Sequence, residues 1–150
     1  MLFRSNKPDV EASSYAVLAQ ILFQQGKTKD AQDAAEHSAT LSKKLDRTAR
    51  FESAIATAEV QTDNRNLADA ARQLEAAHAE AARYGYAVYE MLFRFELARL
   101  NFKSGKPSIG EASLQQLLKD AQARGYLLIV REARSILRSQ TDRHQTRKAS

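Results

Sequence analysis

The chain has 150 residues, enough for one domain that buries a core without metal ions or crosslinks, and a formal net charge of +5. Cysteine is absent, which excludes disulfides, thiolate zinc sites and cysteine nucleophiles. No segment approaches the roughly 20 apolar residues of a membrane span, and the first residues lack the apolar run of a signal peptide. We therefore expect a cytoplasmic protein that binds no membrane.

Glycine and proline divide the chain into seven predicted helices. Both prolines and four of the five glycines interrupt the apolar periodicity. Strong helix formers dominate between them, and β-branched residues never alternate with polar ones, so we predict an all-α fold. The predicted helices cover residues 11–25, 29–44, 48–62, 67–84, 87–104, 109–124 and 126–140, and residues 141–150 are predicted to form a basic flexible tail.

Several helix ends carry recognisable signals. Ser108 lies three residues before Glu111 and predicts a capping box, and Thr28 and Asn66 are predicted N-caps. Gly85 and Gly125 follow predicted helices, and each precedes a tyrosine. Glycine suits a helix C-terminus because the chain often adopts a positive φ angle there.

A helix–turn–helix pattern recurs along the chain with a long period. Its later occurrence repeats a leucine–alanine pair and a glycine at constant offset: Leu18, Ala19 and Gly26 return as Leu97, Ala98 and Gly105. A middle copy around Ala58 divides this interval into two nearly equal steps, and the same step separates Gly85 from Gly125. A period of about 40 residues predicts a helical solenoid, in which stacked helix pairs share a continuous core.

In three stretches, large and small apolar residues have a spacing that resembles the tetratricopeptide repeat. The matching positions are Tyr15, Leu18, Ala19, Leu22, Gly26 and Ala31, then Ala54, Ala58, Leu67, Ala70, Leu74 and Ala77, then Leu97, Ala98, Gly105, Gly110, Leu114 and Leu117. The resemblance implies a right-handed superhelical stack of antiparallel helix pairs in one domain over residues 1–140. Its repeats would cover residues 12–44, 48–84 and 87–124, with a capping helix at 126–140.

The period is longer than that of the usual repeat, which is roughly 34 residues, and in this respect it resembles the long-helix variety of the family. Thr57 and Gln61 also stand where the family normally has apolar residues. The end of the repeat region is similar to the last helix of repeat regions in bacterial signalling proteins. That similarity implies a sensory or docking arm.

The family resemblance implies a scaffold that binds a protein or peptide on a concave face lined by the first helix of each pair. The predicted lining residues are Gln20, Phe23 and Gln24 in the first copy, Glu52, Ile55 and Glu59 in the second, and Leu92, Phe95, Arg99, Phe102 and Lys103 in the third. Phe95 and Phe102 lie on a helix that is apolar on most sides, so a core position is the favoured alternative for both.

The C-terminal region supports a second hypothesis. Residues 131–150 hold six basic residues against two acidic ones. Arg131, Arg134 and Arg138 share one helix face, which could bind nucleic acid or another polyanion. The same face could simply solvate a capping helix. Nucleic acid is the less favoured partner because no aromatic residues alternate with the arginines and no recognition-helix motif is present.

The sequence provides little for catalysis. Glu75 and His78 have the Glu-x-x-His spacing of di-iron bundles, but no convincing second pair accompanies them. We therefore expect neither a metal nor a cofactor, and no enzymatic activity.

The sequence leaves open whether the chain forms a homodimer. The first helix carries large apolar residues around its circumference: Tyr15, Val17, Leu18, Ile21, Leu22 and Phe23. Either residues 1–12 cover this helix or a second chain does, as a homodimer.

Overall fold

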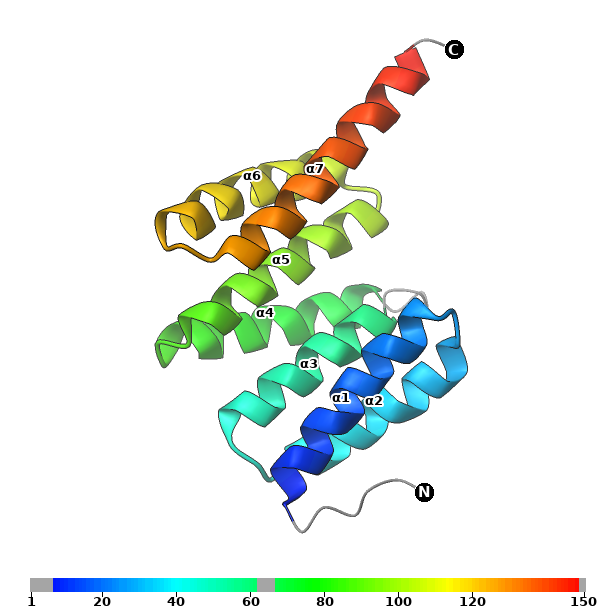
Figure 1. The fold of residues 1–150 in the computed structure, drawn as a ribbon, viewed down its shortest axis with the longest axis vertical. Coiled ribbons are helices and arrows are strands. Elements are labelled where there is room, and N and C mark those ends of the chain that lie inside the picture. The colour runs from blue at the N-terminus through cyan, green and yellow to red at the C-terminus, as the bar shows by residue number, and fades with distance from the viewer. Residues whose placement is uncertain (1–6, 62–66, 149–150) are drawn as a thin grey trace. The chain divides into compact units, whose positions relative to one another are not determined.

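Seven helices make up the part of the chain that the structure, a computed structural model, describes: residues 7–61 and 67–148, with side chains as far as residue 141 (Figure 1). They are α1 (Pro8–Gln24), α2 (Thr28–Ser42), α3 (Arg47–Gln61), α4 (Leu67–Arg83), α5 (Ala87–Lys103), α6 (Pro107–Ala123) and α7 (Leu127–Lys148). No strand occurs in these residues, so the predicted all-α fold is confirmed for them.

The predicted helix boundaries agree with the observed ones to within three residues, except at the end of α7. That helix continues to Lys148, well past its predicted end and through most of the expected flexible tail. The extension contains neither glycine nor proline, the residues that most strongly interrupt a helix. Our prediction that the helix stops near residue 140 was therefore wrong.

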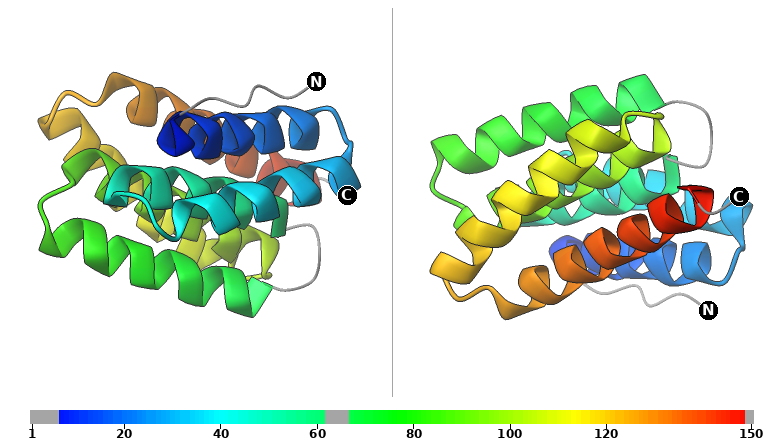
Figure 2. Two further views of the ribbon diagram at one scale, coloured as in Figure 1. Left: turned by 90° about the horizontal axis from the view of Figure 1, so that it is seen from below. Right: turned by 90° about the horizontal axis from the view of Figure 1, so that it is seen from above.

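The chain divides into two compact units, Met1–Glu80 and Ala81–Ser150. In the N-terminal unit, each of α1, α2 and α3 packs against the other two. In the C-terminal unit, α5, α6 and α7 do the same, and the views of Figure 2 show these three helices as neighbours. Both units therefore contain a group of three helices that pack against one another.

Four helices end in the same way. The glycines that follow them have φ angles between 74° and 76°: Gly26, Gly85, Gly105 and Gly125. At the end of α1, the Lys27 N–H donates to the Leu22 carbonyl at 2.9 Å, and at the end of α6 the Tyr126 N–H donates to the Ala121 carbonyl at 2.9 Å. This backbone bond belongs to the Schellman motif, which uses glycine because the left-handed conformation costs other residues more.

The observed N-terminal ends of the helices show that part of the capping prediction was wrong. The residues before α2 and α6 are Lys27 and Lys106, and neither makes a side-chain capping bond. Thr28 and Ser108 lie inside the first turn, because α2 begins at Thr28 and α6 at Pro107. Asp46, which we did not predict, caps α3 by accepting a hydrogen bond from the Ala49 N–H at 3.0 Å. Asn66 lies outside the described residues.

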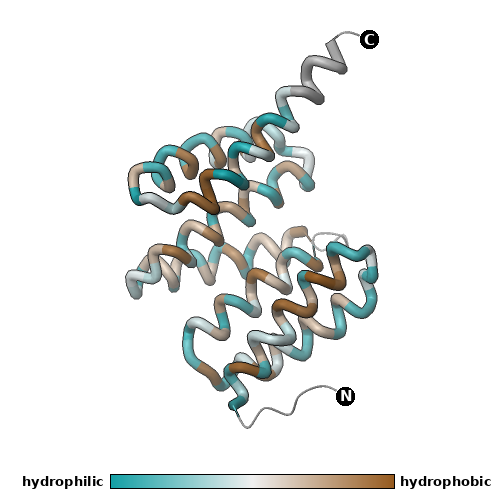
Figure 3. Tube along the Cα trace, in the orientation of Figure 1, coloured by the Kyte–Doolittle hydropathy of each residue, from teal (hydrophilic) through white to brown (hydrophobic). Residues whose placement is uncertain are grey.

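The apolar residues buried in each unit recur at helical spacing. Figure 3 shows hydrophobic and hydrophilic residues alternating along the same helices. Residues at matching places in the two units keep the offset that separates Leu18 from Leu97. Both members of each such pair are buried: Ala12 and Met91, Ala19 and Ala98, Ala31 and Gly110, Ala35 and Leu114, and Ser38 and Leu117. The repeat seen in the sequence is therefore also a repeat of buried positions.

Candidate interaction surfaces

The predicted partner-binding residues of α1 and α3 are only partly accessible. Gln24 is exposed and Gln20 is half-buried. Phe23 packs against the core of the N-terminal unit, and Ile55 is 9% exposed. Glu52 and Glu59 are half-buried, and a Glu52 carboxylate oxygen accepts a hydrogen bond from the Ser13 hydroxyl at 2.5 Å. That bond joins α1 to α3 on the side where both helices were expected to face a partner.

A groove of about 530 Å³ lies between the N-terminal parts of α1 and α3. Its lining combines apolar, hydroxyl and carboxylate side chains: Asp9, Val10, Ser13, Ser14, Val17, Asp46, Thr48 and Ala49. Val10 and Val17 are 48% and 53% exposed, although valine is usually buried. The sequence analysis included Val17 in a possible homodimer surface but assigned none of these residues to the concave partner-binding face. The heptad spacing of the two valines on one face of α1 was a signal that could have identified them.

The apolar residues of α1 separate into two groups. Tyr15, Leu18, Leu22 and Phe23 pack against the core of the N-terminal unit. Val17 and Ile21 stay exposed and share a face with Val10. The helix is thus covered on one side by its own unit, whereas on the other side the described residues leave Val17 and Ile21 exposed; residues 1–6, part of the segment expected to cover the helix, lie outside the described residues.

The predicted strip on α5 belongs mainly to the core of the C-terminal unit. Leu92, Phe95 and Phe102 pack against the buried cluster that contains Met91 and Leu114. Side chains that pack in this way are poor exposed anchors for a partner. Their positions agree better with the alternative that these residues belong to the core. The physical reason is that α6 and α7 both pack against α5, so little of its circumference is left open.

The two cations predicted on α5 differ in their surroundings. The Arg99 guanidinium donates to both carboxylate oxygens of Glu96, at 3.0 and 3.1 Å, and lies 5.9 Å from the centre of the Phe95 ring. The Glu96 side chain is only 8% exposed, so the arginine compensates a nearly buried carboxylate. Lys103 is exposed near the end of the helix.

A further ion pair joins α5 to α6. Arg94 donates to Asp120 at 2.7 Å, and this hydrogen bond is the main reason that the pKa of Asp120 lies below its ordinary value. The pair is partly exposed to solvent. It therefore acts at the surface of the C-terminal unit and not in its core.

The three arginines of the second hypothesis lie together on α7. Arg131, Arg134 and Arg138 are exposed and line a shallow groove of about 580 Å³ with Leu127 and Val130. Arg131 pairs with the neighbouring Glu132 at 3.1 Å. Among the described residues, no hydrogen bond or ion pair engages Arg134 or Arg138. We refer to the exposed surface formed by Arg131, Arg134 and Arg138 as the arginine face of α7.

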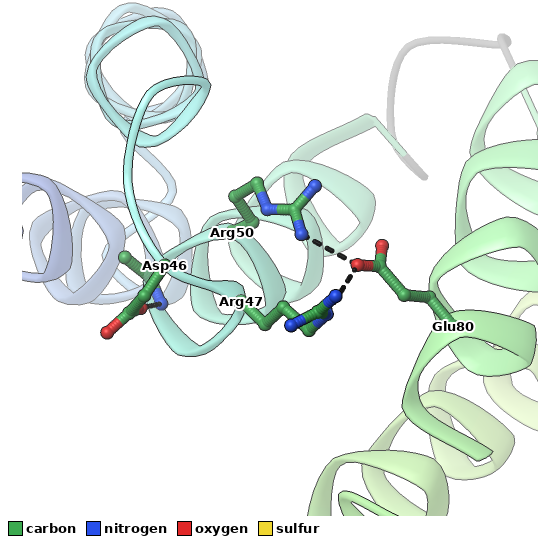
Figure 4. Close-up of polar contacts among 5 residues, drawn as sticks. Asp46, Arg47, Arg50 and Glu80 are labelled. Atoms are coloured by element: carbon green, nitrogen blue, oxygen red, sulfur yellow. Dashed lines mark hydrogen bonds and ion pairs between the residues drawn. The ribbon is translucent and has the colours of Figure 1, made fainter. Parts of the chain in front are cut away.

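A different arginine cluster connects α3 to α4 inside the N-terminal unit. The Glu80 carboxylate of α4 accepts from Arg50 at 2.6 Å and from Arg47 at 3.1 Å. Figure 4 shows both arginines extending from α3 toward this one carboxylate. The structure thus contains an example of how an acidic residue of one helix binds to a basic face of another.

Glu75 and His78, considered above as a metal pair, do not form a site with other ligands. Glu75 is exposed, and no group of three potential metal ligands occurs in the part of the chain that the structure describes. None of the described helices combines the length and the apolar character that crossing a bilayer requires.

Comparison with known proteins adds no assignment, because no protein-family model, no curated protein and no solved structure matches this chain.

Proposed function

We propose that this chain is a helical-repeat scaffold of the tetratricopeptide type that binds a protein or peptide segment in the groove between α1 and α3. The observation that carries the proposal is the groove itself, in which exposed valines stand beside hydroxyl and carboxylate groups. Apolar side chains supply most of the binding free energy in such grooves, and a few polar groups orient the ligand.

The repeated architecture supports a scaffold. Three helices pack against one another in each unit, and buried positions of the first two helices recur at a constant offset along the chain. In stacked helix pairs, the first helices line a common concave face. In such a stack, α1 and α3 are first helices, and Gln20 and Gln24 continue the face of Val17 along α1.

The lining chemistry indicates the kind of ligand. The carboxylates of Asp9 and Asp46 line the groove together with the hydroxyls of Ser13 and Thr48, so a segment with a small apolar residue and a basic group fits best. Backbone amides of an extended peptide could donate to the serine and threonine hydroxyls.

The test selects peptides from a random library on the whole chain and measures their affinity for two variants. Val17→Glu places a charge in the groove and is expected to weaken binding at least tenfold, an effect of about 1.4 kcal/mol. Ile109→Glu is the matched control, because Ile109 is 54% exposed and lies on α6. Selected peptides that bind both variants as tightly as the unchanged chain would contradict the groove assignment.

A further inference from the structure

When α3 and α7 are aligned by their buried positions, the arginine face of α7 matches a face of α3 that begins at Arg50, the residue that pairs with Glu80 of α4. Core residues show the correspondence: Ala56 and Val60 of α3 lie in the N-terminal core, and their counterparts Ala133 and Leu137 of α7 pack in the C-terminal core. The offset between these pairs is two residues shorter than the offset between Leu18 and Leu97.

This correspondence aligns four positions on the two helices. Arg50, Ala54, Thr57 and Gln61 of α3 match Leu127, Arg131, Arg134 and Arg138 of α7. All four residues of α3 are half-buried, whereas all four of α7 are exposed. Leu127 is 76% exposed, the largest fraction among the exposed large apolar side chains of the described residues.

On α3, this face receives a carboxylate from a neighbouring helix. Glu80 of α4 bonds to Arg50 at 2.6 Å and to Arg47 at 3.1 Å (Figure 4). One carboxylate that serves two guanidinium groups is a charge-assisted contact stronger than a neutral hydrogen bond. On α7, Leu127 stands at the position of Arg50, and the three guanidinium groups follow it on the same face beside a groove of about 580 Å³.

We propose that the arginine face of α7 is a docking site for an amphipathic helix from another protein, with carboxylates that pair with Arg134 and Arg138 and an apolar residue that covers Leu127. The arginines are three and four residues apart, so carboxylates at the same spacing on one face of a partner helix would meet them. Leu127 and Val130 favour a helix over a nucleic acid, because a phosphate backbone would leave the leucine uncovered.

A second copy of this chain fits the face less well. The exposed side of α2 has carboxylates, Asp30, Asp33 and Glu36, but exposes no large apolar side chain. The exposed side of α1 has Val10, Val17 and Ile21 but only one exposed acidic residue, Asp9. Neither of these two faces in the described residues combines several carboxylates with a large apolar side chain, so a different protein is the better source of the partner helix.

The experiment measures the binding of a labelled synthetic peptide by fluorescence anisotropy. The peptide is a designed amphipathic helix with glutamates spaced three and four residues apart and leucines beside them. We expect the unchanged chain to bind it, the glutamine counterpart to bind at least about tenfold more weakly, and added salt to weaken binding. Equal binding of the two peptides would overturn the proposal.

Charge-reversal variants test whether the peptide binds at the arginine face of α7. Arg134→Glu with Arg138→Glu should reduce binding by at least about tenfold, since attraction is replaced by repulsion at two positions. A peptide with lysines in place of the glutamates should bind this double variant and not the unchanged chain. Lys119→Glu, at an exposed position on α6, is the charge-reversal control and should leave binding unchanged. If the control weakens binding as much as the double variant, the assignment to α7 is wrong.

Two further measurements separate this site from other functions. Val17→Glu should not change binding of the acidic peptide, so this proposal and the groove between α1 and α3 can fail independently. A duplex DNA of arbitrary sequence should bind more weakly than the peptide at the same salt concentration. Tighter DNA binding that the double variant abolishes would replace the helix by a polyanion as the ligand of this face.

Discussion

The two units use one arrangement of helices but fill it with different side chains. At matching buried positions the N-terminal unit has Ala12, Ala35 and Ser38, and the C-terminal unit has Met91, Leu114 and Leu117. Small residues let helices approach closely, whereas large ones fill the space between more distant helices. Mutual packing of three helices is therefore compatible with two core compositions. The stability of each unit should depend on a different kind of interaction.

The largest expected effect is the loss of a leucine from the C-terminal core. Leu117 is fully buried, so Leu117→Ala should lower the free energy of unfolding by about 2–5 kcal/mol through lost burial and a cavity. The matching change in the N-terminal unit, Ser38→Ala, removes only the hydroxyl bond to the Ala12 carbonyl at 2.8 Å and should cost about 1 kcal/mol. Urea denaturation followed by circular dichroism measures both. Equal losses would show that the two cores do not differ as described.

An intermediate effect is expected at Gly110, where α6 lies close to α5. A Cβ atom on Gly110 would lie 3.0 Å from the Ala98 carbonyl oxygen and 3.0 Å from the Phe102 ring. Gly110→Ala should therefore destabilise the chain by about 1–3 kcal/mol, although alanine favours helices. Ala31 occupies the matching position in the N-terminal unit. Thermal unfolding checks this effect, and a higher melting temperature for Gly110→Ala would contradict the close approach.

The smallest effect concerns acid stability. Because Arg94 lowers the pKa of Asp120 in the folded chain, this carboxylate stabilises the fold above its ordinary pKa near 3.8. That contribution is lost as the pH falls through the lowered pKa. Asp120→Asn should make the free energy of unfolding less dependent on pH below about 4, with little loss of helix content. Asp33→Asn, on the exposed side of α2, is the control, and identical pH profiles for the two variants would contradict the role of Asp120.

The candidate surfaces were less predictable than the helices. Gln24, Lys103 and the three arginines of α7 are exposed, in agreement with a surface position. Phe95 and Phe102 pack in the core instead, because α5 has apolar residues on several sides and periodicity alone does not show which side is covered. The groove at Val10 and Val17 was missed for a related reason, since its walls come from α1 and α3, which are separated in the sequence by α2.

The sequence by itself determined where the helices lie, apart from the end of α7, and that Gly85 and Gly125 end two of them. Helix propensity and the positive φ angle of glycine act within a few neighbouring residues, so they can be recognised without knowledge of the fold. Only the tertiary structure decided which helix faces are covered. Leu127 and Leu117 are the same residue type on helices of one unit, yet one is 76% exposed and the other fully buried. That difference depends on which helices pack beside each residue, and on α7 it leaves the arginine face open.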